Sequence, residues 1–193
     1  MSSVINLVVV SGSPFRPSRT DVLLNALSAA LERVLPVRTR VVALADIAAD
    51  IGTVLSRERL PGHVEDELRA IEQADILLAG APVYRGSLPG LFKHLFDLIG
   101  IDALAGKPVL IAATGGSQRH ALVVDHQLRP LFSFFQSLVL PTGVYATPDD
   151  FTDYDITDSA LKSRIELVID QALPVLNGLF PDARFRSAET LAA

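Results

Sequence analysis

The stretch INLVVVSGSPFRPSRT, residues 5–20, decides the fold. It begins with an almost entirely apolar run and ends in a loop rich in hydroxyl groups, with Arg16 and Arg19 as its charges. A short apolar run of this kind is typical of a strand that is covered on both faces. The loop leads into an amphipathic helical pattern marked by Leu23, Leu27, Ala30, Leu31 and Val34. A buried strand followed by such a helix is the first unit of an α/β fold.

The same alternation recurs along the whole chain. Further strands are predicted at 39–44, 75–81, 108–114 and 137–146, and helical periodicity lies at 64–71, 90–100, 121–138 and 161–172. Five β–α units predict a parallel sheet with right-handed crossovers and helices on both faces. At this length we expect a flavodoxin-like three-layer sandwich with strand order 2-1-3-4-5 rather than a six-stranded Rossmann fold.

The 193 residues show no internal repeat and no low-complexity linker. We therefore expect one domain over residues 1–180, followed by a mobile tail at 181–193. We expect residues 45–63 to form a loosely structured connection, because Gly52, Pro61 and Gly62 interrupt any regular pattern there.

Composition excludes several classes of function. The chain has no cysteine, so disulfides, thiolate catalysis and cysteine-ligated metals are ruled out. Its four histidines are scattered without metal-ligand spacing, and we expect no metal site. A net charge of −5 argues against a nucleic-acid partner. Without a basic N-terminal region or a run long enough to span a membrane, a cytoplasmic protein with no membrane partner is expected.

The helices at 90–100 and 121–138 are apolar over most of their circumference. Such helices are covered on more than one side, either within the monomer or by another subunit. We expect a homo-oligomer, a homodimer or homotetramer, with Phe96 facing the interface. Pro130 lies inside the second pattern, where it removes the hydrogen bond to the carbonyl of His126. This predicts a kink or π-bulge at His126, a distortion that is frequent at functional sites.

Three unusual loops follow the first, third and fourth strands, at the sheet edge where ligands bind in open parallel sheets. The first offers the hydroxyl groups of Ser11, Ser13, Ser18 and Thr20 together with Arg16 and Arg19. It precedes a helix N-terminus, whose free N–H groups favour an anion such as a phosphate. The alternative is a simple helix cap with solvated arginines.

The other two loops suit a planar ring. APVYRGSLPG (81–90) is stiffened by prolines and carries Tyr84, and ATGGSQRH (113–120) contains Gly115 and Gly116. Paired glycines allow backbone N–H groups to approach a ring closely. Taken alone, each of these two loops is better explained as an ordinary turn, and it is the combination of three such loops at one sheet edge that indicates a ligand site.

GSPFRPSRT (12–20), APVYRGSLPGLFKHLFDL (81–98) and LIAATGGSQRHALVVDHQLRP (110–130) together resemble the NAD(P)H-dependent FMN reductases of the flavodoxin-like superfamily. The resemblance is strongest to reductases that serve two-component alkanesulfonate or methanesulfonate monooxygenases. It implies that NADH or NADPH reduces FMN, and that reduced flavin passes to a partner monooxygenase. Implied FMN contacts are Ser11, Ser13, Arg16, Ser18, Arg19 and Thr20 for the phosphate; Pro82, Val83, Tyr84 and Arg85 beside the ring; and Thr114, Gly115, Gly116 and Ser117 at its pyrimidine end.

No catalytic side chain is required, because the flavin carries the hydride chemistry. Two alternatives stay open: a quinone or azo-dye reductase with bound FMN, and a flavodoxin-like electron carrier. The choice between NADH and NADPH is open too, with Arg85 and Arg119 as possible partners of a 2′-phosphate. In alkanesulfonate-type relatives a bulge with tyrosine at the place of His126 lies at a subunit interface, which implies that flavin exchanges as a substrate. His126 could also be an ordinary interfacial residue.

Overall fold

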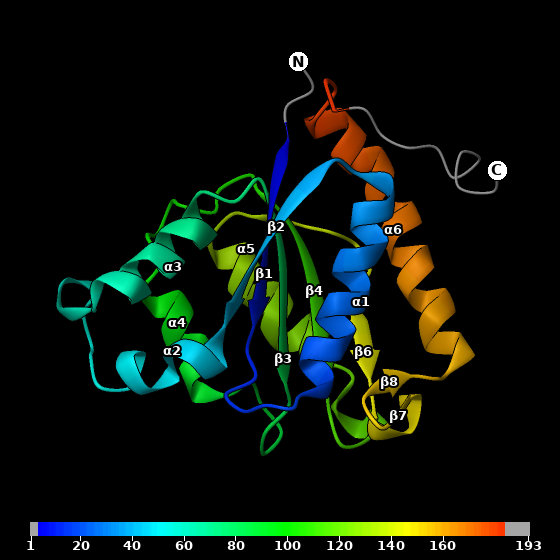
Figure 1. The fold of residues 1–193 in the computed structure, drawn as a ribbon, viewed down its shortest axis with the longest axis horizontal. Coiled ribbons are helices and arrows are strands. Elements are labelled where there is room, and N and C mark those ends of the chain that lie inside the picture. Colours follow the sequence, from blue (N-terminus) through cyan, green and yellow to red (C-terminus); the bar gives the residue numbers. More distant parts are fainter. Residues whose placement is uncertain (1–3, 184–193) are drawn as a thin grey trace.

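The computed structural model describes residues 4–183 and shows a parallel sheet between two layers of helices (Figure 1). Its main strands lie in the order β2-β1-β3-β4-β5. They are β1 (Ile5–Ser11), β2 (Val37–Ala43), β3 (Ile76–Pro82), β4 (Pro108–Thr114) and β5 (Leu138–Val139). Strands β1, β3 and β4 are covered on both faces, as their apolar sequences predict. The predicted α/β fold and strand order are confirmed.

Two hydrophobic cores lie on the two faces of the sheet. On one face are α1 (Arg19–Val34) and α6 (Ser159–Leu179). On the other are α2 (Leu44–Ile51), α3 (Gly62–Glu72), α4 (Gly90–Asp97) and α5 (Arg129–Phe134), as Figure 1 shows. Ser18 is the N-cap of helix α1, and its hydroxyl accepts the backbone N–H of Asp21 at 3.4 Å. This cap places the N-terminus of α1 directly after the loop that follows β1.

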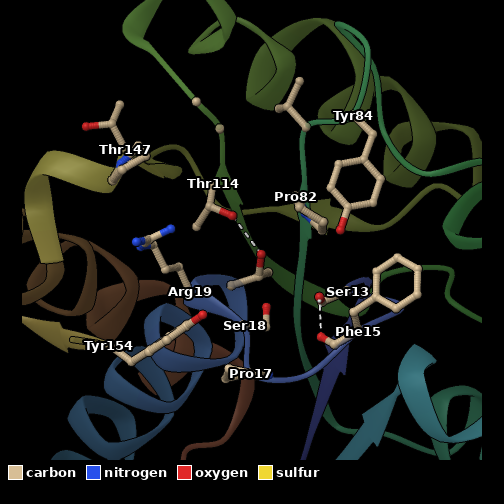
Figure 2. Close-up of a pocket in the computed structure, with 15 residues that line it drawn as sticks. Ser13, Phe15, Pro17, Ser18, Arg19, Pro82, Tyr84, Thr114, Thr147 and Tyr154 are labelled. Atoms are coloured by element: carbon tan, nitrogen blue, oxygen red, sulfur yellow. Dashed lines mark hydrogen bonds between the residues drawn. The ribbon is translucent and has the colours of Figure 1, made fainter. Parts of the chain in front are cut away.

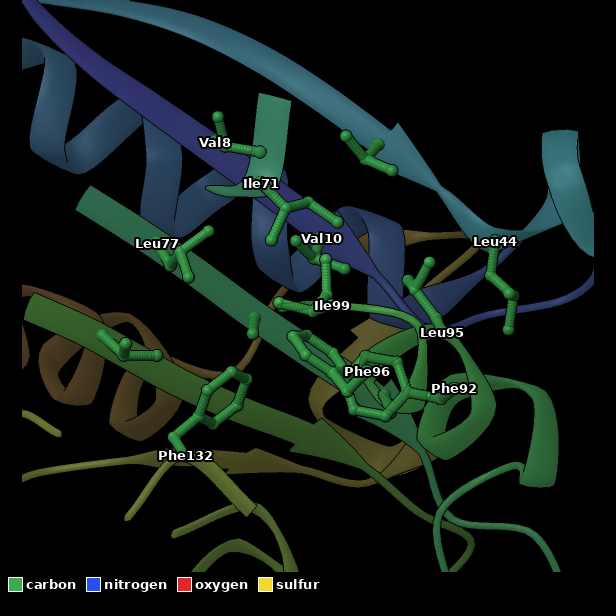
Figure 3. Packing of buried hydrophobic residues seen from close by; sticks show 14 of the residues in the cluster. Val8, Val10, Leu44, Ile71, Leu77, Phe92, Leu95, Phe96, Ile99 and Phe132 are labelled. Carbon is green, nitrogen blue, oxygen red and sulfur yellow. The ribbon is translucent and has the colours of Figure 1, made fainter. Parts of the chain in front are cut away.

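Aromatic rings fill the core under α4 (Figure 3). Phe96 contacts Phe92 and Phe132 edge to face, with ring centroids 5.1 and 5.0 Å apart. Only 1% of Phe96 is exposed, so the expectation that it faces a subunit interface is wrong. Phe134 on α5 is instead 64% exposed. The apolar excess of α4 serves the monomer core, whereas part of that on α5 remains on the surface.

The segment 45–63 is more ordered than predicted. Residues Leu44, Ile47 and Ile51 form a buried stripe on α2, at the spacing of an amphipathic helix. Intervening alanines and aspartates obscure this stripe in the sequence. A 3-10 turn, η1 (Arg57–Arg59), follows before α3.

The last predicted strand and the helix before it are also shorter than expected. Residues 137–146 divide into β5 and β6 (Val144–Ala146), both parallel to β4. Pro141 lies between them and has no N–H to donate to a ladder. The helix expected to reach residue 138 ends at Phe134, because Gln136 takes a left-handed conformation with φ of 56°. A hairpin of β7 (Phe151–Thr152) and β8 (Asp155–Ile156) then leads to α6.

A π-helical turn, η3 (Val124–Leu128), precedes α5 and contains His126. The distortion predicted from Pro130 is therefore present at His126. The side-chain oxygen of Gln127, in the same turn, accepts the hydroxyl of Ser87 at 2.8 Å and the N–H of Leu88 at 3.1 Å. The turn thus holds the loop that follows β3.

Arg57 ties the connection between α2 and α3 to its neighbours. Its guanidinium donates to both carboxylate oxygens of Glu65, each at 2.9 Å, and also to Glu72. Glu72 in turn accepts the backbone N–H of Gly100 at 2.9 Å. Hydrogen bonds, the largest from Arg57, lower the pKa of Glu65 to about 2.

We expect Arg57→Gln to lower the free energy of unfolding at pH 7 by about 1–2 kcal/mol, because charge-assisted bonds at a partly exposed site are lost. A carboxylate with a depressed folded-state pKa stabilises the fold above its unfolded pKa, and the stabilisation is lost as pH falls through the folded pKa. For Glu65 this window runs from 4.5 down to about 2. Urea titrations of both proteins at neutral and acid pH should show the difference shrinking in acid. An equal difference at both pH values would contradict the ion-pair account.

Among residues 4–183, no helix is long and apolar enough to cross a membrane. Of the predicted tail 181–193, residues 184–193 lie outside the described part of the chain. Ala183, at the end of that part, is buried against the core on the α6 face.

Candidate functional site

The three loops singled out in the sequence meet at one edge of the sheet. Adjacent registers pair Ser11 with Gly80 and Pro82 with Thr114, so β1, β3 and β4 end side by side. Their following loops enclose a cleft with a cavity of about 250 Å³ (Figure 2).

Most of the predicted site residues line this cavity. They are Ser13, Ser18, Arg19, Thr20, Pro82, Val83, Tyr84, Thr114, Gly115 and Gly116. Four others, namely Ser11, Arg16, Arg85 and Ser117, are not among its lining residues. The cleft therefore draws on all three loops but not on every polar group in them.

The first loop brings the N-terminus of α1 to the cavity. Ser18 caps the helix, and the first N–H groups of any helix lack intrahelical acceptors. The buried hydroxyl of Thr20 lies 2.6 Å from that of Thr114, which joins α1 to the end of β4 (Figure 2). Ser13 donates its hydroxyl to the carbonyl of Phe15 at 2.9 Å. This end of the cleft thus offers N–H and hydroxyl groups beside the guanidinium of Arg19.

Arg16 is bound to acidic side chains outside the cavity. Its guanidinium donates to the two carboxylate oxygens of Asp46, on α2, at 2.5 and 2.9 Å. This pairing, more than the nearby Asp21, raises the pKa of Arg16. Ser11 likewise donates its hydroxyl to Asp21. Both residues hold the loop in place from behind, a role that spacing in the sequence could not distinguish from direct contact with a ligand.

The second loop is a tight hairpin. Tyr84 and Ser87 exchange backbone hydrogen bonds of 2.8 and 3.1 Å across a turn made by Arg85 and Gly86. Both turn residues have positive φ, 52° and 82°, as a two-residue hairpin turn requires. Arg85 therefore occupies the tip of the hairpin, while Tyr84 at its base forms a wall of the cleft (Figure 2).

The two glycines of the third loop have different surroundings: Gly115 is closely packed, and Gly116 faces open space. A Cβ on Gly115 would lie 2.2 Å from the hydroxyl oxygen of Tyr145, so no larger residue fits there. The Tyr145 hydroxyl donates to the carbonyl of Ser117 at 2.7 Å, and burial raises its pKa. A Cβ on Gly116 would meet no atom within 4 Å. Gly116 thus borders open space in the cleft, where a ligand could contact its backbone.

Five further residues line the cavity but were not predicted from the sequence as site residues, namely Phe15, Pro17, Thr147, Pro148 and Tyr154. Thr147, Pro148 and Tyr154 follow β6, whose end pairs with Thr114 through Ala146. The rule that loops after parallel strands gather at one edge applies to β6 as well. The predicted strand 137–146 ends at Ala146, so the same rule could have pointed to the residues that follow it.

The lining groups fit a flavin mononucleotide. One end has the hydroxyl groups, helix N–H groups and cation that suit a phosphate. The other has an aromatic wall at Tyr84 and open space beside Gly116, which suit a planar ring. Among the described residues that line the cleft, none forms a nucleophile paired with a general base.

Comparison with known proteins agrees with this reading. Residues 5–152 match the family described as NADPH-dependent FMN reductase. The chain belongs to this family. Its members are oxidoreductases that use NAD(P)H to reduce FMN, so the expected enzyme class and cofactors are confirmed.

Relatives within the FMN reductases match over nearly the whole chain. An NADH-dependent FMN reductase, SfnF, of Pseudomonas fluorescens is 59% identical over 91% of this chain and 94% of its own length. An FMN reductase (NADPH) of Pseudomonas aeruginosa is 55% identical, covering 92% of this chain and 96% of its own. An oxidoreductase from Corynebacterium diphtheriae has the same fold, with a TM-score of 0.75 and 32% identity over 93% of this chain and 98% of its own.

Proposed function

We propose that the cleft binds FMN with its phosphate at the N-terminus of α1 and its ring between Tyr84 and Gly116. The observation that carries this orientation is the separation of the two kinds of lining group. Donors and a cation gather at Ser18, Arg19 and Thr20, whereas the open space lies beside Gly116. A monophosphate ester of a planar ring needs this arrangement of groups.

Bound FMN would supply the hydride-accepting chemistry, and the task of this chain's residues is to hold and orient it. The Thr20–Thr114 hydrogen bond sets the distance between the phosphate end and the ring end of the site. The backbone N–H groups of Gly116 and Ser117 are the donors proposed to stabilise negative charge at the pyrimidine end. The Gln127 contacts fix the loop that carries Tyr84.

The site also supports flavin as an exchanging substrate. Arg19 is exposed, and Phe15 at the rim is 70% exposed, so the cleft opens broadly to solvent. Release of reduced FMN to a partner flavin-dependent monooxygenase of the sulfonate type is consistent with this, and it rests on the family resemblance. Arg16, Arg85 and Ser11 act from outside the cavity in this proposal. The cytoplasmic location stays a prediction.

Steady-state oxidation of NADH or NADPH with free FMN as the sole acceptor tests the function. Turnover that saturates with FMN, from a protein whose yellow colour is lost on dilution, is the expected result. Saturation with a quinone but not with added FMN would favour a quinone or azo-dye reductase with bound flavin. Absence of any pyridine nucleotide oxidation would favour an electron carrier. Both coenzymes need to be compared, because the relatives named above differ in this respect.

A second surface supports a homo-oligomer. A groove of about 600 Å³ runs between α4 and α5, lined by Leu88, Lys93, Gln127, Leu131, Phe134 and Phe135 among others. Its apolar lining and exposed Phe134 are suited to burial by a second copy of the chain. Gln127 lines this groove and also holds the Tyr84 loop, so assembly and the flavin site would share one element. His126 is exposed and lies in the same π-helical turn. We therefore propose that it affects subunit packing and, through it, flavin exchange.

The glycine at the ring end offers a direct test of the orientation. We expect Gly116→Val to weaken FMN and riboflavin binding alike, by about ten-fold, because its side chain would enter the space proposed for the ring. Stability should change little, since a Cβ at this position meets no atom within 4 Å. Fluorescence titration with both flavins, beside thermal unfolding, provides the measurement. Unchanged affinity for both flavins would place the ring elsewhere.

A further inference from the structure

The β7–β8 hairpin stands beside the phosphate end of the cleft. Its turn consists of Asp153 and Tyr154, with φ values of 46° and 68°. Positive φ at two successive non-glycine residues is uncommon, and it closes the hairpin tightly. The Tyr154 ring consequently lines the cavity (Figure 2).

The hairpin is held firmly in this place. The carboxylate of Asp150 accepts the backbone N–H of Thr147 at 2.6 Å, and its carbonyl accepts that of Thr157 at 3.0 Å. Phe151 is buried in the core on the α6 face. Asp158, just after the hairpin, caps α6 by accepting the N–H of Leu161 at 2.7 Å. These contacts at the base make the tip a fixed wall rather than a loose loop.

Tyr154 contacts the residue that defines the phosphate end. The guanidinium carbon of Arg19 lies 5.5 Å from the centre of the Tyr154 ring, within the range of a cation–π interaction. In Figure 2, Tyr154 and Tyr84 lie on opposite sides of the cleft. In the proposed FMN orientation the ring end of the site is at Tyr84, and a flavin that continued beyond its first phosphate would pass Tyr154.

We propose that Tyr154 is a specificity-determining residue that selects flavin mononucleotide against flavin dinucleotide. In FMN the phosphate ends the molecule, whereas in FAD the chain continues through a second phosphate to an adenosine. If the first phosphate lies at Arg19, this continuation must pass the Tyr154 ring and displace it from Arg19. The inference rests on the proposed FMN orientation and adds the selectivity of the site to it.

The charge of the hairpin acts in the same direction. Asp149, Asp153 and Asp155 are exposed on and beside it. A second phosphate leaving the cleft on this side would meet like charges, which oppose binding. None of these three aspartates is among the residues that line the cavity. In the proposed orientation they therefore oppose the longer flavin rather than flavin phosphates in general.

The test compares kcat/KM for FMN and for FAD, with NADH as donor, in wild type and two ring-free variants. Tyr154→Gly and Tyr154→Asn both tolerate the left-handed conformation, so the turn is preserved. Tyr154→Phe is the matched control, because it keeps the ring and its contact with Arg19. We expect wild type to prefer FMN, and the ring-free variants to gain kcat/KM for FAD by about three-fold to thirty-fold, the range a cation–π contact spans.

Several outcomes would overturn the proposal. One is a wild type that uses FAD as well as FMN, and another is an unchanged kcat/KM for FAD in both ring-free variants. An equal gain for both flavins would make Tyr154 a general obstruction, and a Tyr154→Phe variant that behaves like Tyr154→Gly would assign the effect to the hydroxyl. A wild type that reduces neither flavin would contradict the proposed function instead, so the two failures are distinguishable.

Discussion

Arg19→Ala should raise the dissociation constant for FMN by about ten-fold to a hundred-fold. Loss of a charge-assisted contact to a phosphate costs about 1.5–3 kcal/mol, and ~1.4 kcal/mol corresponds to a factor of ten. Arg19 is the first residue of α1 and lines the cavity, so its charge adds to that of the helix N-terminus. Flavin fluorescence titration measures the effect.

Two controls sharpen this prediction. Riboflavin lacks the phosphate, so its affinity should fall little in Arg19→Ala; an equal loss for both flavins would contradict the phosphate assignment. Arg16→Ala removes the other arginine of the same loop, whose guanidinium is bound to Asp46 outside the cavity. Its effect on FMN affinity should be clearly smaller. An Arg16 variant as impaired as the Arg19 variant would mean that Arg16 leaves Asp46 to bind the phosphate.

Phe96→Ala should lower the free energy of unfolding by about 3–5 kcal/mol. The substitution removes a buried aromatic ring and leaves a cavity between Phe92 and Phe132, which cannot fully collapse. Urea unfolding followed by circular dichroism measures the loss. A change below about 1 kcal/mol would contradict the place of Phe96 at the centre of this core.

Phe134 provides the matched comparison on the neighbouring helix. Because its side chain is 64% exposed, Phe134→Glu should leave the monomer folded. If the groove between α4 and α5 is a subunit interface, the same variant should disperse the oligomer in sedimentation. A wild type that sediments as a monomer, or a Phe134→Glu variant that assembles normally, would contradict the proposed interface.

The framework of the molecule could be predicted from the sequence because its causes are local. Near-continuous apolar runs such as 5–10 and 108–114 are typical of strands buried on both faces, and their alternation with helical periods leaves few topologies. The place of the site follows from the same reasoning, since loops after parallel strands gather at one edge. Even the distortion at His126 was predictable, because Pro130 removes a particular hydrogen bond.

Only the tertiary structure decided where individual side chains point and which residues they contact. Phe96 and Phe134 read alike in an apolar helix pattern, yet one is enclosed by aromatic rings and the other faces outward. Arg16 and Arg19 are three residues apart in the sequence. Within residues 4–183, Arg16 pairs with Asp46 of α2 and lies near Asp21, whereas no acidic side chain pairs with Arg19. Tyr154 reaches the cleft because β6 pairs with β4 and carries the hairpin to the same edge. Burial periodicity is a property of neighbours along the chain, whereas these contacts join residues far apart in sequence, and only packing brings them together.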